Sequence, residues 1–157
     1  MNPSDKIYSS LESLATACAA IRASGQTLVL TSGCFDILHQ DHGRYVYAAS
    51  LLGHLIVGIN SDAFVRRLKG PNRPHRPEDD RAYTMACFEA ASGVTVFDDD
   101  LELIEAVTPH IYVVSGTSHV LIEDDPLRLA LIERLGIKVT QIASNNTTST
   151  TAILSKL

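Results

Sequence analysis

The stretch that decides the fold is Leu28-Val29-Leu30-Thr31-Ser32-Gly33-Cys34-Phe35-Asp36-Ile37-Leu38-His39-Gln40-Asp41-His42-Gly43. Its apolar start predicts a buried strand that breaks at Gly33, and a short polar turn then leads into a helical segment. Two histidines, His39 and His42, stand where that helix is expected to begin. Backbone N–H groups of such a turn and the helix N-terminus favour anions, so the stretch predicts a phosphate site.

Strand-like and helix-like segments alternate along the rest of the chain. We expect strands at 26–32, 54–60, 94–97, 110–114 and 137–142, and helices at 11–24, 42–52, 62–68, 78–92, 101–105, 126–135 and from 149 onward. Ser9 with Glu12 predicts a capping box before the first helix. Together the segments predict an α/β fold, a Rossmann-like doubly wound parallel sheet of about five strands with helices on both faces. We expect one domain over residues 1–157.

Composition excludes several classes of protein. The chain has 157 residues, 45% apolar and 20% charged, as in a soluble globular protein, and no apolar run suited to a bilayer. Its N-terminus lacks the pattern of a signal peptide, so a cytoplasmic location is expected. The three cysteines, Cys18, Cys34 and Cys87, lack the spacing of a metal site or a disulfide framework. A net charge of -5 argues against a nucleic-acid partner.

A second candidate region is the irregular stretch from Lys69 to Pro77. It contains three prolines and four potentially cationic side chains in an otherwise acidic protein. Such a loop is often a solvated connector, and loop statistics alone leave the two interpretations about equal. Its expected position near the ligand-binding edge of a parallel sheet favours a binding role. The run 98–100 would suit a metal ion, but a helix N-cap region is the simpler interpretation.

The combined pattern resembles the nucleotidyltransferase superfamily marked by a His-x-Gly-His motif. Within it, the pattern is most similar to the branch of heptose-1-phosphate adenylyltransferases and glycerol-3-phosphate cytidylyltransferases. The matching segments are 31–39, 58–62, 68–70 with Arg73-Pro74, 78–81 and 149–151. Lys-Gly followed by Arg-Pro looks more like the heptose branch.

The resemblance implies transfer of a nucleoside monophosphate, AMP from ATP, to a sugar phosphate such as a heptose 1-phosphate, with release of pyrophosphate. Mg²⁺ would accompany the nucleoside triphosphate, and a homodimer is suggested. The implied catalytic residues are His39, His42 and Lys69. The implied nucleotide and phosphate ligands are Ser32, Gly33, Cys34, Phe35, Arg81, Gly116, Ser149 and Thr150. The implied acceptor ligands are Asp36, Asn60 and Asp62, although Asp36 suits an Asx-turn or a cap equally well.

Two positions depart from the family pattern. Asp41 stands where the family has glycine between the histidines, and the segment 115–119 keeps only Gly116 of a Lys-Gly-x-Asp-aromatic motif. A carboxylate near a triphosphate repels it unless it turns away or binds the metal. Two alternatives therefore stay open: a cytidylyltransferase acting on glycerol phosphate or another polyol phosphate, and a nucleotide-binding relative with little or no catalysis. A regulatory or scaffold domain is the least favoured.

Overall fold

A computed structural model describes residues 2–116 and 124–143. The elements in chain order are η1 (Pro3–Lys6), β1 (Ile7–Tyr8), α1 (Leu11–Ala23), β2 (Leu28–Gly33), α2 (Gln40–Ser50), β3 (His54–Asn60), α3 (Asp62–Lys69), α4 (Glu78–Ala86), β4 (Gly93–Phe97), α5 (Asp100–Val107), β5 (Ile111–Ser115), α6 (Pro126–Leu135) and β6 (Lys138–Ile142). No helix in these described ranges is long and apolar enough to span a bilayer.

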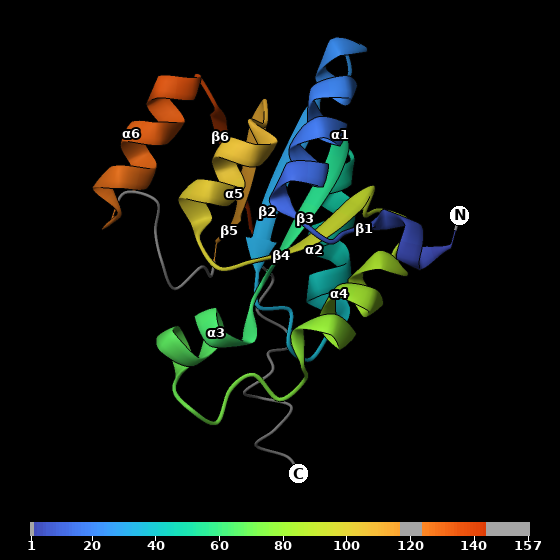
Figure 1. Cartoon of the computed structure of the whole chain (residues 1–157), viewed down its shortest axis with the longest axis vertical. Coiled ribbons are helices and arrows are strands. Elements are labelled where there is room, and N and C mark those ends of the chain that lie inside the picture. Colours follow the sequence, from blue (N-terminus) through green and yellow to red (C-terminus); the bar gives the residue numbers. More distant parts are fainter. Residues whose placement is uncertain (1, 117–123, 144–157) are drawn as a thin grey trace.

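The described strands form one parallel sheet in the order β1-β4-β3-β2-β5-β6. Leu30 of the central strand β2 pairs with Ile56 of β3 on one side and with Tyr112 of β5 on the other. From β2 the chain winds outward in both directions, with helices on both faces of the sheet (Figure 1). This confirms the expected α/β, doubly wound, Rossmann-like architecture.

Apolar side chains fill the space on each face of the sheet. On one face, Leu14 of α1, Leu103 of α5 and Leu131 of α6 are buried in a common cluster. On the other face, Val46 of α2 and Met85 of α4 are buried together. Helices α2 and α6, which follow β2 and β5 along the chain, therefore lie on opposite faces of the sheet, the arrangement that opens a crevice at the carboxyl ends of two such strands. Doubly wound sheets bind ligands at such a crevice.

Helix α3 lies at the end of the sheet, where its Phe64 packs against Phe97 of one core cluster. Figure 1 shows it beyond the carboxyl ends of the central strands, with the connection to α4 passing beneath the sheet edge. The side chain of Ser61 caps it by accepting a hydrogen bond from Phe64 N, as the sequence suggested. Its last residue, Lys69, therefore lies at the same edge as the turn after β2.

The sheet has one more strand than the five expected from the sequence. Strand β1 has only two residues, Ile7 and Tyr8, which pair with Val94 and Thr95 of β4. Two residues are too few to show the alternation of polar and apolar side chains by which strands are recognised. The missing strand therefore carries no sequence signal of its own.

Three helix boundaries also differ from expectation. Ser10, not Ser9, caps α1 by accepting a hydrogen bond from Ser13 N, which places Glu12 outside the capping-box position. Helix α2 begins two residues before His42, and α4 ends at Ala86 rather than near residue 92. The N-cap at Asp99 and the left-handed Gly136 after α6 agree with the sequence prediction.

Candidate functional site

A sharp turn follows β2 at the carboxyl edge of the sheet. Phe35 adopts a left-handed backbone conformation, φ 47°, which is uncommon for a residue with a bulky side chain. Its ring folds back over Gly33, where a Cβ atom would lie only 3.1 Å from the ring. Strain of this kind persists when surrounding packing fixes it, and Phe35 is buried. The backbone from Gly33 to Phe35 is thus held in one shape at the edge of the sheet.

The two histidines of the motif lie side by side at the start of α2. His39 is the N-cap residue and His42 occupies the first turn, and their ring centroids are 4.0 Å apart. Phe35 packs against His42 edge-on, with centroids 5.5 Å apart. Among the described residues, neither Nδ1 atom has a hydrogen-bond partner. The structure therefore brings both imidazoles to the turn.

The charge state of His42 is set by its surroundings. Burial, together with His39 and Lys69, lowers the pKa of His42 to about 4, and Asp41 acts in the opposite direction. His42 is therefore neutral at pH 7, and its ring donates one hydrogen bond. A bound anion would favour the protonated ring and raise this pKa.

Lys69 approaches the same place from the end of α3. Its charge acts on His42 and also on Cys34, so the ammonium group lies within electrostatic reach of both. Burial raises the pKa of the Cys34 thiol despite the nearby cations, which keeps the thiol neutral. His39 and His42 thus lie next to each other at the carboxyl edge, and the charge of Lys69 acts on His42.

Asp36 holds the cationic loop instead of facing outward. Its buried carboxylate accepts hydrogen bonds from the backbone N–H groups of His75 (2.9 Å) and Arg76 (3.0 Å). Arg73 adds two contacts of 2.9 Å to the same carboxylate, through Nε and Nη2. These partners account for the lone pairs of Asp36 and favour a structural role over the acceptor-binding one, although the carboxylate anchors a distant loop and does not form the local Asx-turn or cap that the sequence suggested.

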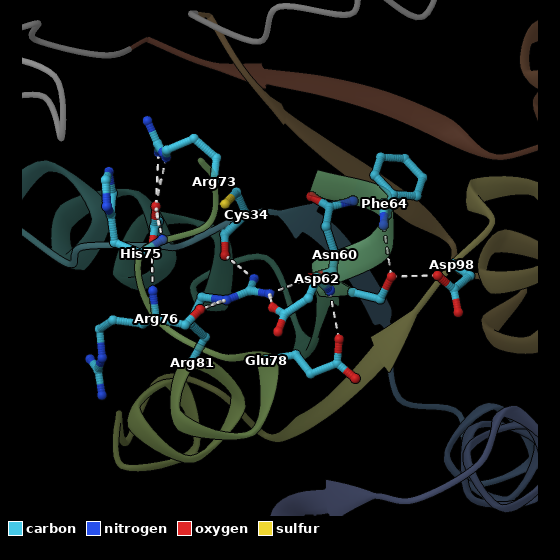
Figure 2. A network of polar contacts seen from close by, with 12 residues as sticks. Cys34, Asn60, Asp62, Phe64, Arg73, His75, Arg76, Glu78, Arg81 and Asp98 are labelled. Carbon is cyan, nitrogen blue, oxygen red and sulfur yellow. Dashed lines mark hydrogen bonds and ion pairs between the residues drawn. The ribbon is translucent and has the colours of Figure 1, made fainter. Parts of the chain in front are cut away.

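Arg81 is the centre of a buried network (Figure 2). Its guanidinium donates to the carbonyl oxygens of Cys34 (2.6 Å), Asn60 (2.8 Å) and Arg76 (2.9 Å), and to Asp62 Oδ1 (2.7 Å). The side chain is fully buried. The sequence suggested a phosphate ligand, whereas these contacts all go to the protein itself.

The same network fixes the start of α3. Glu78 Oε2 accepts a hydrogen bond of 2.6 Å from Asp62 N, and the Ser61 hydroxyl donates to Asp98 Oδ1. Arg67 reaches the carbonyl oxygen of Asp98 at 3.0 Å. The sequence placed Glu78 in the matching segment 78–81 but gave it no partner, because a partner sixteen positions away leaves no local signal.

The remaining expected ligands occupy different places. Ser32 Oγ lies 3.0 Å from Tyr112 Oη on β5, across the crevice, and Gly116 follows β5 with its N–H donating to Ile142 O. Asn60 is buried at the end of β3. Ser149 and Thr150, and the segment 117–119, lie outside the described residues.

Comparisons with known proteins point to one family. A family model described as cytidylyltransferase-like matches residues 30–155. The protein named Bifunctional protein HldE from Trichlorobacter lovleyi is 42% identical over 98% of this chain, and the one from Geobacter sulfurreducens is 38% identical over 98%. The chain spans 31% of the length of each of these relatives.

Solved structures show the same fold. A lipopolysaccharide core biosynthesis protein from Thermoplasma volcanium superposes with a TM-score of 0.64 at 24% identity, over 79% of this chain and all of that one. A pantoate-beta-alanine ligase from Francisella tularensis gives 0.63 at 11% identity, over 96% of this chain and 72% of that one. Taken with the family match and the sequence relatives, these findings show that the chain belongs to the cytidylyltransferase-like family of nucleotidyltransferases.

Proposed function

We propose that this chain transfers AMP from ATP to a sugar phosphate such as a heptose 1-phosphate and releases pyrophosphate. The observation that carries the proposal is the pair of imidazoles, His39 and His42, beside the turn after β2, with the charge of Lys69 acting on His42. The Lys-Gly and Arg-Pro pairs at 69–70 and 73–74 favour a heptose phosphate as acceptor. The relatives named Bifunctional protein HldE support the same class of reaction.

The chemistry asks for positioning and charge stabilisation. An oxygen of the acceptor phosphate attacks the α-phosphorus of ATP, a new P–O bond forms, and the bond to the β-phosphate breaks as pyrophosphate leaves. The attacking oxygen is already anionic, so no general base is required. His39 and His42 would donate hydrogen bonds to the triphosphate, and Lys69 would offset the charge that builds on the leaving group.

The donor set at this edge suits Mg²⁺ carried by the substrate. The carboxylates of Asp36 and Asp62 are already engaged by Arg73 and Arg81. Phosphate oxygens and water would therefore be the main ligands of the ion, with the charge of Asp41 close to His42 beside them. When bound, Mg²⁺ supplies charge neutralisation on the phosphates.

Pyrophosphate release tests the proposal directly. Purified protein would be incubated with ATP or CTP and a panel of phosphorylated acceptors, including heptose 1-phosphate and glycerol 3-phosphate. We expect release with ATP and the sugar phosphate. Thermal-shift titration with each triphosphate separates an adenylyl from a cytidylyl donor, because a bound ligand stabilises the native state. Folded protein that is silent with every pair would refute the assignment.

Asp41 favours a second candidate, a nucleotide-binding protein without turnover. A carboxylate beside the histidines opposes the approach of a triphosphate. On this alternative the wild type binds a nucleotide but releases no pyrophosphate, and the substitutions D41G and S115K together create activity. An active wild type would eliminate this candidate.

A further inference from the structure

Arg81 makes four hydrogen bonds to groups of the protein, all between 2.6 and 2.9 Å. A guanidinium group has five N–H donors in a fixed planar fork, so one donor at most remains. The side chain is fully buried, and its ion-pair partner Asp62 is 23% exposed. A residue placed in this way is suited to holding segments of the chain together.

The segments that Arg81 joins all meet at the candidate site (Figure 2). Cys34 belongs to the turn after β2, Asn60 ends β3, Asp62 begins α3, and Arg76 belongs to the loop that Asp36 anchors. The guanidinium therefore links the backbone of the turn after β2 to the base of α3. This link crosses between elements that are neighbours in space and distant in sequence.

The position of Lys69 depends on the direction of α3. Asp62 and Lys69 are the first and last residues of this helix, seven positions apart, which corresponds to about 10 Å along the axis. A tilt of about 10° at the base would move the far end by roughly 2 Å, and misplacement of about 1 Å can lower a rate about a hundredfold. Contacts at the base of α3 thus strongly affect the position of Lys69.

We propose that Arg81 is a positioning residue for nucleotidyl transfer, which keeps Lys69 and the turn after β2 in register through its bonds to Cys34 and Asp62. The inference rests on the proposed function and assigns Arg81 no contact with substrate. It replaces the role of direct phosphate ligand that the sequence suggested for this arginine.

The test compares R81K, D62N and the double variant. R81K keeps the charge but loses the planar fork, and D62N removes the negative charge opposite Arg81 while leaving an acceptor oxygen and the arginine in place. We expect kcat for pyrophosphate release to fall about a hundredfold in R81K and at least about tenfold in D62N, with ATP affinity changed less than about threefold. The double variant should be no slower than R81K, because both changes break the same tie.

A phosphate-binding arginine predicts the opposite pattern. R81K would then weaken ATP binding more than about tenfold in calorimetry, whereas D62N would leave it unchanged or strengthen it by releasing the arginine. A D62N variant that raises only the KM of the acceptor would place Asp62 in the acceptor site and also contradict the proposal. D62N keeps the test decisive if R81K does not fold.

Arg22 supplies a matched control. Its guanidinium also donates to backbone carbonyls, those of Val107 and Thr108, at the opposite edge of the sheet. R22K should therefore keep kcat within about twofold of the wild type while losing comparable hydrogen bonds. A wild type that neither binds ATP nor releases pyrophosphate refutes the proposed function, whereas an active wild type with independent R81K and D62N effects refutes this inference alone.

Discussion

Replacing Asp36 with asparagine should destabilise the protein far more than the small change in the side chain suggests. The carboxylate is 1% exposed and receives donors from Arg73, His75 and Arg76. Asparagine keeps the shape but presents an NH₂ group to one of these donors and removes the charge opposite Arg73. The change therefore breaks an ion pair and leaves a donor facing a donor in a buried place.

The amount of stability lost in D36N follows from how exposed Asp36 and Arg73 are. Removing one member of a buried ion pair costs about 3–5 kcal/mol. Arg73 is 19% exposed and can turn partly to water, so we expect the lower limit, about 3 kcal/mol at pH 7. This is a large part of the about 5–15 kcal/mol that stabilises a typical domain.

Urea unfolding followed by circular dichroism gives the free energy, and hydrogen exchange of the His75 and Arg76 amides reports on the loop itself. D80N is the control, because exposed Asp80 pairs with Arg76 only at 3.9 Å and should matter by less than about 0.5 kcal/mol. A D36N variant as stable as D80N, with both amides still protected, would refute the role of Asp36 as anchor.

The pH dependence of the free energy of unfolding gives a second check on the role of Asp36. Burial alone would raise the pKa of Asp36, but the backbone hydrogen bonds from His75 and Arg76 and the charge of Arg73 outweigh it and lower the pKa. A carboxylate with a lowered pKa stabilises the folded state above its ordinary pKa and loses this effect as the pH falls. The difference in free energy of unfolding between the wild type and D36N should therefore become smaller below about pH 4. A difference in free energy of unfolding that stays constant with pH would contradict an ionic origin of the lost stability.

Three further outcomes are expected. The folded state lowers the pKa of His42 from 6.5 to about 4, so on acidification this histidine takes up a proton in the unfolded chain first. The free energy of unfolding should therefore fall by up to about 3 kcal/mol between about pH 6.5 and pH 4. In urea unfolding, the H42N variant should lack this fall. ATP binding should raise the same pKa, so calorimetry at pH 5.5 should show proton uptake as a buffer-dependent heat, and equal heats in all buffers would contradict it. G58A should cost about 1–3 kcal/mol in urea unfolding, because a Cβ would lie 2.6 Å from Leu103 Cδ2 and 3.0 Å from Phe97 Cε1 in the core; unchanged stability would contradict this packing.

Local patterns were sufficient to predict the strand, the turn and the histidine pair. The apolar run from Leu28, the glycine that ends it and the helix that follows are each encoded within a few residues. His39 and His42 are three positions apart, so a single helical turn brings them together. These features are encoded locally, which is why the strand, the turn and the adjacent histidines were predictable from the sequence.

Partners distant in sequence were not predictable from one chain. Asp36 and Arg73 are thirty-seven positions apart, and Arg81 reaches Cys34 across forty-seven. Nothing in the local sequence distinguishes an arginine that will be buried against carbonyl oxygens from one that will bind a phosphate. The shift of the α1 cap from Ser9 to Ser10 has a similar cause, because adjacent serines offer equivalent caps and packing selects between them.

At the carboxyl edge of the sheet, two arginines and one lysine have different surroundings. Arg73 and Arg81 are engaged with Asp36 and Asp62, where a rigid fork with several donors can satisfy carboxylates and carbonyl oxygens at once. Lys69, by contrast, is exposed and forms no ion pair within residues 2–116 and 124–143. A compact ammonium on a flexible stem can follow a phosphate group whose charge moves during reaction. These arginines therefore hold parts of the edge together, whereas Lys69 is, under the proposed function, the cation at this edge that meets the substrate.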